Sequence, residues 1–379
     1  MDDTRRARAT LSLNIPFRMK ESARELAGYR ASYTGDAAAR SAYLDALEAE
    51  MAASARRGDF DGVTFEALRV VGGSPSIMNG DRLGRIVAAA RRGLPLAHGC
   101  EACVEALPQT VCTASLTGWS QGGVDAVSLR VGSVHERELA AIGATYDADA
   151  VRNAVLFLDR FHVDTLEAVI VVGIPGQTPQ SLRRTLRACV GFESKRIRIE
   201  PYRGAIIGSG ALDETLAAHA ADIDDASLLF DAARDFLAGQ GFVHRSCDLF
   251  VRTGARSAFD DARLQGCDFF ELGLDARTVA DGFLCRSTSD YATYVECSTL
   301  PDAVFDRIVE EDDRARRLRF ACCRLGALER VPLDAHDPDA EAFFASLESM
   351  GLAKRKDGCV SLTSAGMLLW PLIPQPMQG

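Results

Sequence analysis

The sequence predicts an α/β fold in which helices cover a mainly parallel sheet. Apolar runs rich in Val and Ile alternate with longer helical patterns through the first half of the chain, as expected of repeated strand–helix units. Several of these runs, such as residues 166–174, are almost entirely apolar. Such runs are typical of strands that are buried on both faces of a parallel sheet.

The elements follow in order along the chain. We expect strands at residues 11–17, 63–71, 102–107, 124–131, 166–174 and 196–201. Helices are expected between them, at residues 37–55, 81–92, 114–120, 149–161 and 181–190. Residues 212–237 form an amphipathic pattern, residues 242–253 and 269–274 are predicted strands, and the chain from Pro301 is mainly helical with a helix–strand–helix end.

The composition of the chain excludes some classes of function. With 379 residues, of which 47% are hydrophobic, the chain can bury a large core. Its formal charge of −10 argues against a nucleic-acid partner, because phosphate binding needs clustered Lys and Arg. The first residues lack the apolar run of a secretory signal, and the longest apolar run is too short to span a membrane. We therefore expect a cytoplasmic protein with neither a nucleic-acid nor a membrane partner.

Four short motifs occur at the expected strand ends. They are I-P-F at residues 15–17, G-G-S-P-S at 72–76, E-A-L-P at 105–108 and G-I-P-G-Q-T-P at 173–179. In this order they resemble the radical S-adenosylmethionine (SAM) enzymes related to oxygen-independent coproporphyrinogen III oxidase. The resemblance implies a partial (β/α)6 TIM-type barrel over residues 1–210, an α/β extension over 211–300 and a winged-helix-like tail over 301–379.

The loop after the first strand departs from that family. The family carries C-x-x-x-C-x-x-C directly after I-P-F, and these thiolates bind a 4Fe–4S cluster. The three positions are Arg18, Ser22 and Glu25 here. On this basis we expect no 4Fe–4S cluster, and therefore no coproporphyrinogen oxidation. Three further family positions also differ. Gly132 and Ala144 replace residues that contact SAM in the family, and Val169 stands where the family often has aspartate.

Other family positions are retained. The resemblance implies that the turn carrying Gly72, Gly73 and Ser74 receives the methionyl amine of SAM, and that Gln177 belongs to a neighbouring loop of the same site. SAM therefore stays a candidate cofactor. The haem-chaperone branch of the family has H-N-x-x-Y-W where residues 259–264 read F-D-D-A-R-L, which argues against haem delivery.

New charges stand on the expected barrel strands. Arg130 lies on the fourth strand, and Arg196, Arg198 and Glu200 alternate on the sixth, so they share one face. An unpaired arginine inside a barrel is costly, so we expect these groups to pair with one another, with Glu105 or with an anionic ligand. One interpretation is an internal salt-bridge network. The other is a pocket for a carboxylated ligand, with Arg130 and Arg198 as anchors and Glu105 and Glu200 as acid–base groups.

The eleven cysteines allow a further interpretation. Cys100, Cys103 and Cys112 lie close together in sequence, but scattered thiols in a cytosolic chain usually pack as small apolar side chains, so we expect no metal site. Three hypotheses remain. The first is a radical-SAM-fold enzyme without a cluster, such as a SAM-dependent transferase or cyclase of specialised metabolism, acting on a small carboxylated molecule by polar chemistry. The second is an inactive relative that binds or regulates a protein partner, and the third is an iron–sulfur protein that uses Cys100, Cys103 and Cys112.

Overall fold

The computed structural model describes residues 7–19, 35–202, 223–332 and 338–373. Its centre is a curved sheet of 12 strands in the order β12-β11-β10-β9-β1-β2-β3-β4-β5-β6-β8-β7. The six barrel strands are parallel to one another. They are β1 (Ala7–Ile15), β2 (Val63–Gly72), β3 (Leu96–Ala106), β4 (Ala126–Gly132), β5 (Thr165–Val172) and β6 (Arg196–Pro201). The expected partial (β/α)6 barrel is confirmed.

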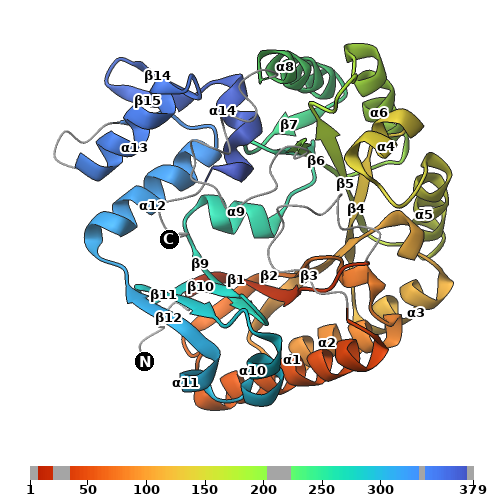
Figure 1. The fold of residues 1–379 in the computed structure, drawn as a ribbon, viewed down its shortest axis with the longest axis vertical. Coiled ribbons are helices and arrows are strands. Elements are labelled where there is room, and N and C mark those ends of the chain that lie inside the picture. The colour runs from red at the N-terminus through yellow and green to blue at the C-terminus, as the bar shows by residue number, and fades with distance from the viewer. Residues whose placement is uncertain (1–6, 20–34, 203–222, 333–337, 374–379) are drawn as a thin grey trace.

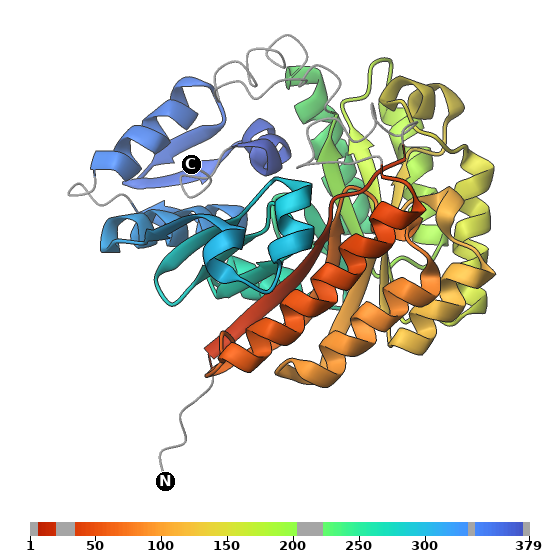
Figure 2. The same cartoon turned by 60° about the horizontal axis from the view of Figure 1, so that its bottom comes forward.

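Helices cover the outer face of these strands (Figure 2). They are α1 (Ala37–Arg57), α2 (Gly80–Gly93), α3 (Thr113–Gly122), α4 (Glu136–Ile142), α5 (Ala148–Arg160), α6 (Pro179–Gly191) and α8 (Ile223–Gly239). Local signals fix their ends: the Asp36 side chain accepts a hydrogen bond from the backbone N–H of Ala39 at the start of α1, and Gly58 ends that helix in the left-handed region. Of the amphipathic pattern over residues 212–237, residues 212–222 lie outside the described ranges.

Later strands extend both edges of the barrel sheet. β8 (Leu249–Arg252) pairs antiparallel with β6 and is followed outward by β7 (Phe242–His244), while β9 (Asp268–Leu272) pairs parallel with β1. β10 (Arg277–Ala280), β11 (Phe283–Ser287) and β12 (Phe305–Glu310) continue beyond β9. The short helix α9 (Ala258–Leu264) joins β8 to β9, contacts β1 and β2, and lies between the two edges (Figure 1).

The remaining elements form the end of the chain. Helices α10 (Tyr291–Cys297) and α11 (Pro301–Val304) lead into β12. A three-stranded sheet of β13 (Val331–Pro332), β15 (Cys359–Leu362) and β14 (Ala353–Lys356) follows, with α12 (Asp313–Gly326), α13 (Pro338–Ser349) and α14 (Ser364–Leu369), and it has its own apolar core. The domain limits at residues 210 and 300 stay predictions. Within the described ranges, each helix is too short or too polar to cross a bilayer.

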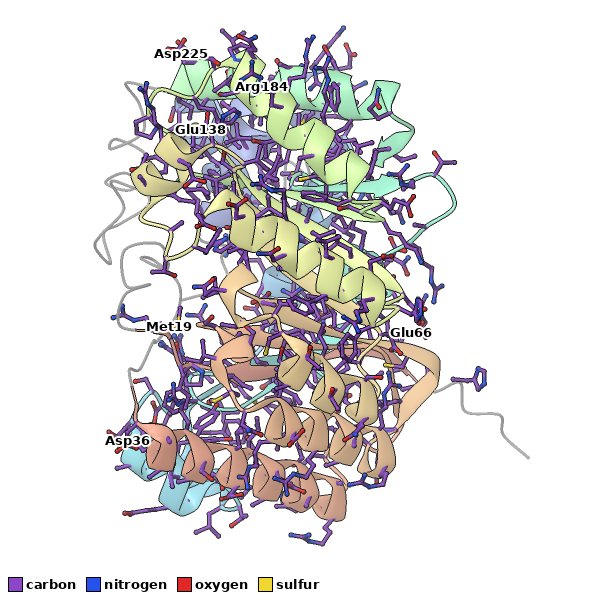
Figure 3. All side chains as sticks on the ribbon, turned by 90° about the vertical axis from the view of Figure 1, so that its right-hand side faces the viewer. Met19, Asp36, Glu66, Glu138, Arg184 and Asp225 are labelled. Carbon is purple, nitrogen blue, oxygen red and sulfur yellow. The ribbon has the colours of Figure 1, made fainter. Side chains whose placement is uncertain are left out.

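The carboxyl ends of the barrel strands share one edge of the molecule. Figure 3 shows Met19 and Glu138, which follow β1 and β4, on the same side, whereas Glu66 near the start of β2 lies on the other. Parallel barrels bring their functional residues together at the carboxyl ends of the strands. The candidate site is therefore expected at that edge and in the barrel interior below it.

Candidate functional site

The turn after β2 is held tightly against the end of β1. Gly72 has a φ of +124°, and a Cβ atom there would lie 2.4 Å from the carbonyl oxygen of Ile15. A Cβ atom on Gly73 would lie 2.5 Å from the carbonyl oxygen of Phe17. Only glycine fits this approach, so the turn places the following residue, Ser74, at the barrel mouth. Ser74 is 3% exposed, and its hydroxyl has no hydrogen-bond partner among the residues that the structure describes.

This turn forms one wall of a cavity of about 70 Å³. The other walls come from β3, β4, β5 and β6 and from Leu107 directly after β3. The lining residues are Gly72, Gly73, Ser74, Pro75, Glu105, Ala106, Leu107, Ser128, Arg130, Glu167, Val169, Arg198 and Glu200. The sequence-predicted residues Gly72, Gly73, Ser74, Glu105, Arg130, Arg198 and Glu200 are thus brought together.

Glu105 is an acidic group of this cavity that forms no ion pair with the residues that the structure describes. It lies on β3 opposite Ser128 of β4, and its carboxyl group forms no hydrogen bond within the described part of the chain. Burial raises the pKa of Glu105 to about 7, with Arg69 opposing the shift and Glu200 adding to it. The carboxyl group can therefore gain or lose a proton near neutral pH.

Glu167 is the centre of the charge network, and the sequence interpretation missed it. Its side chain is fully buried on β5. It accepts hydrogen bonds from Arg69 at 2.9 Å, Ser128 at 3.0 Å and Arg198 at 3.1 Å. Burial alone would raise the pKa of Glu167, but the surrounding arginines, led by Arg198, hold it well below its usual range. One sequence feature could have identified Glu167 as a site residue: it is the single acidic residue in an otherwise apolar strand.

Arg198 pairs with three carboxylates. Besides Glu167, its guanidinium lies 2.5 Å from Asp248 before β8 and 3.0 Å from Asp260 on α9. Arg69 lies 3.5 Å from the same Asp260. The protein itself therefore neutralises Arg198, which leaves little capacity to anchor a ligand carboxylate.

The other predicted charges also pair within the protein. Arg130 Nη1 donates to Glu200 at 2.9 Å. Arg196 is fully buried, and its Nη1 donates to Glu101 at 2.8 Å. Gln177 lies outside the lining: its amide accepts from the backbone of Gly173 and donates to the carbonyl of Val171, which fixes the turn after β5.

A second, larger cavity of about 340 Å³ adjoins the same charge network. It opens between β2, the turn before β8, α9 and the C-terminal elements. Its lining is Arg69, Glu105, Arg198, Ser246, Cys247, Asp248, Phe259, Asp260, Arg263, Leu264, Gly326 and Trp370. Glu105 and Arg198 line both cavities, so these side chains separate the two spaces.

The eleven cysteines are spread over several elements of the fold. All eleven are free thiols; Cys100 and Cys103 are buried on β3, whereas Cys112 is exposed before α3. Across the described ranges, no three His, Cys, Asp or Glu side chains are placed to hold a metal ion. This placement gives no support to an iron–sulfur site at these three residues.

The sequence of the chain is similar to those of several related proteins. No protein-family model matches it. It is 26% identical over 201 residues to an oxygen-independent coproporphyrinogen III oxidase of Paracoccus denitrificans, covering 51% of this chain and 43% of that protein. It is 22% identical over 350 residues to an anaerobilin synthase of Escherichia coli O157:H7, covering 89% and 77%. A haem chaperone of Mycobacterium tuberculosis is 24% identical over 321 residues, covering 77% and 78%.

The solved structures agree with the fold. A coproporphyrinogen III oxidase from Escherichia coli that is a radical SAM enzyme superposes with a TM-score of 0.72 at 18% identity, covering 97% of this chain and 89% of that one. The chain has the radical SAM fold. It is a homologue of the oxygen-independent coproporphyrinogen III oxidases. It spans about half the length of the oxidases it matches, 43% to 59%.

These comparisons correct one expectation. The prediction that this chain has no 4Fe–4S cluster is wrong. Its homologues and the structure that it superposes on are related to radical SAM enzymes, which bind SAM and such a cluster, and the chain has eleven cysteines. The prediction rested on three loop positions alone.

The side chains that would ligate a cluster are not identified in the structure. Arg18 stands at the first loop position, and positions 22 and 25 lie outside the described residues. The cysteines that the structure describes do not gather in threes. The described residues therefore do not fit a three-thiolate site.

Proposed function

We propose that this radical-SAM-fold protein binds a small carboxylated molecule in the barrel, with SAM as the first candidate, and that Glu105 performs polar acid–base chemistry on it. The observation that carries the proposal is the position of Glu105. Its carboxyl group lines both cavities, has no hydrogen bond from the described residues, and has a pKa of about 7. A general acid–base works best with a pKa near the working pH.

The two cavities suit different parts of the reacting molecules. A space of about 70 Å³ holds a head group the size of a few waters. We assign it to the amino-acid end of the ligand, beside the Gly72–Ser74 turn. The second space, about 340 Å³, is within the range of small-molecule sites, and its Phe259 and Trp370 provide apolar walls for a second reactant.

The charges define the roles of the residues. Glu105 as a carboxylate accepts a proton from a nucleophile while that nucleophile forms its new bond, and as a carboxylic acid it returns the proton to a product or leaving group. Glu200 orients Arg130 through their 2.9 Å hydrogen bond, which keeps the guanidinium at the cavity wall. Such a proton-transfer site fits a transferase or a cyclase. A cytoplasmic role in specialised metabolism is part of the same proposal.

Titration calorimetry with SAM tests the proposal. We expect SAM to bind the wild-type chain, and Arg130→Ala and Glu105→Gln to abolish binding while the circular dichroism spectrum is retained. Glu66→Gln is the matched control, because it removes the same charge from a residue that lines neither cavity.

Two results would count against the proposal. If both pocket variants unfold, the charges are structural. If folded wild-type chain does not bind SAM, the function of a binding protein for another macromolecule becomes the better hypothesis.

A further inference from the structure

We propose that the second, larger cavity binds a neutral, planar ring that carries a hydrogen-bond donor beside an acceptor, such as a cyclic amide, and that Glu105 and Arg69 contact this edge of the ring. The inference rests on the proposed function, because it names the chemical class of the second reactant at the same site. The donor hydrogen of the ring is then the proton that Glu105 accepts.

Arg69 and Glu105 are neighbours on the interior face of the barrel. Arg69 of β2 stands opposite Cys103 of β3. Glu105 lies two residues further along β3, so its side chain points to the same face. The positive charge of Arg69 accordingly opposes the rise in the pKa of Glu105 that burial causes. Both side chains line the second cavity, and a ligand there can contact both at once.

Each of these groups keeps hydrogen-bonding capacity that the described residues do not use. Arg69 is 6% exposed, and its Nη2 contacts Glu167 and Asp260. Its Nε is buried and has no partner in the described part of the chain. The carboxyl group of Glu105 forms no hydrogen bond with those residues either. Because buried polar groups in native proteins are normally hydrogen-bonded, we expect the ligand to present an acceptor to Arg69 and a donor to Glu105.

Aromatic side chains stand beside these polar groups. The guanidinium carbon of Arg69 lies 4.8 Å from the centre of the Phe259 ring. Phe259 and Trp370 both line the cavity, and Trp370 follows directly after α14. The cavity is therefore bounded by rings from two separate parts of the chain. Aromatic faces pack well on a flat ring, and a cavity of about 340 Å³ is large enough for a small ring system.

The charges around the cavity favour a neutral ligand over an anion. Arg198 pairs with Asp248 and Asp260, and Arg69 contacts Asp260 as well. All four residues belong to the lining, so acidic groups of the same cavity already neutralise these two arginines. An anionic ligand would have to give up its hydration among these carboxylates, which is costly.

Arg263 is the third arginine of the lining, and it also has partners in the protein. Its guanidinium carbon lies 4.2 Å from the centre of the Phe269 ring and 5.8 Å from that of Phe259. Aromatic faces stabilise a cation without a counter-ion. Arg263 therefore does not require an anion in the cavity.

Titration calorimetry of the full chain with three ring probes tests the ligand class. 2-Pyridone carries an N–H beside a carbonyl oxygen, N-methyl-2-pyridone keeps only the carbonyl, and benzoate is a planar anion of similar size. We expect 2-pyridone to bind in about the millimolar range, as small fragments do. It should bind at least about fivefold more tightly than either of the other probes, because only 2-pyridone satisfies both groups without adding charge.

Two substitutions assign the contacts. Glu105→Leu removes the acceptor for the ring N–H and should abolish the preference for 2-pyridone over N-methyl-2-pyridone. Arg69→Lys keeps a positive charge beside Glu167 but removes Nε, and it should weaken both pyridones alike. Glu66→Leu and Arg91→Lys are the matched controls, because neither residue lines a cavity, and all affinities should stay unchanged. If Arg69→Lys loses the native circular dichroism spectrum, the comparison with Glu105→Leu decides alone.

The failures of the two proposals are distinguishable. Three results would each overturn the ligand class even if SAM binds: benzoate binding as tightly as 2-pyridone, equal affinities for the two pyridones, or no binding of 2-pyridone at millimolar concentration. A preference for 2-pyridone that depends on Glu105, without SAM binding, supports the ligand class and counts against the proposed function.

Discussion

Arg69 and Glu167 meet across the barrel, with Nη2 of Arg69 2.9 Å from Oε2 of Glu167. The two residues belong to β2 and β5, which are separated in the sheet by β3 and β4. The ion pair therefore crosses the barrel interior and joins two strands that are not neighbours in the sheet. Asp260 of α9 contacts the same Arg69 at 3.5 Å, which ties the helix between the sheet edges to the barrel.

Glu167→Gln tests this bridge. The substitution keeps the shape of the side chain but leaves Arg69, Arg196 and Arg198 without their shared anion. Removing one partner of a buried ion pair costs about 3–5 kcal/mol, so we expect a loss of that order in the free energy of unfolding from urea titrations. Glu66 is a partly exposed pair partner of Arg8, and Glu66→Gln should change stability by less than about 1 kcal/mol.

Acidification should destabilise the folded chain through protonation of Glu167. The pKa of Glu167 is held well below its usual range in the folded chain, so the folded state binds this proton less readily than the unfolded state does. Its stabilising contribution is complete above the unfolded pKa and is lost as the pH falls through the folded pKa. Urea titrations between pH 6 and pH 3 should show a steep decline in the wild type and a shallower one in Glu167→Gln. Parallel curves would assign the acid sensitivity to other groups.

Some of this site follows from sequence alone, for a physical reason. Alternation along a strand places residues two apart on one face, so Arg198 and Glu200 were expected to share the interior. The Gly72–Gly73 turn was identified from its motif, and the structure gives its reason in the close approach to β1.

Other parts depend on segments that only the folded chain brings together. Asp248 and Asp260 come from outside the barrel strands, and their pairing with Arg198 requires the docking of α9. The sequence motif suggests that Gln177 belongs to the site, but its side-chain amide forms hydrogen bonds with the backbone of its own turn. The third strand begins at Leu96, six residues before the predicted start, because Leu96 already pairs with Phe65 of β2 ahead of a register shift.

Glu50 should give the free energy of unfolding a second pH dependence, opposite in sign to that of Glu167. It is buried between α1 and α10, where it accepts hydrogen bonds from the Tyr294 hydroxyl at 2.6 Å and the Gly273 backbone at 2.9 Å. Burial raises the pKa of Glu50 to about 7. The folded state therefore binds this proton more tightly than the unfolded state, and stability declines as the pH rises from the unfolded pKa to about 7.

Glu50→Gln should reduce that decline. Each pKa unit corresponds to about 1.4 kcal/mol, so Glu50 contributes at most about 3 kcal/mol between pH 4.5 and pH 8. Glu105 adds a slope of the same sign, and the single variant should therefore remove only part of the effect. Urea titrations at pH 5 and pH 8 measure it. An unchanged difference between the two pH values would show that Glu50 does not titrate in this range.

Gly72→Ala tests whether the turn at the barrel mouth is set by close packing or by backbone conformation alone. The new Cβ atom would lie 2.4 Å from the carbonyl oxygen of Ile15, in addition to adopting a φ of +124°. Gly62→Ala is the matched control, since Gly62 has a φ of +74° but no atom within 4 Å of its added Cβ. Left-handed strain costs about 1–2 kcal/mol, and an overpacking clash adds about 1–3 kcal/mol. We therefore expect Gly72→Ala to lower the free energy of unfolding clearly more than Gly62→Ala does, because β1 must move away from the turn. Equal losses would mean that the approach of β1 to the turn adds nothing to the cost, and that the position of Ser74 does not depend on it.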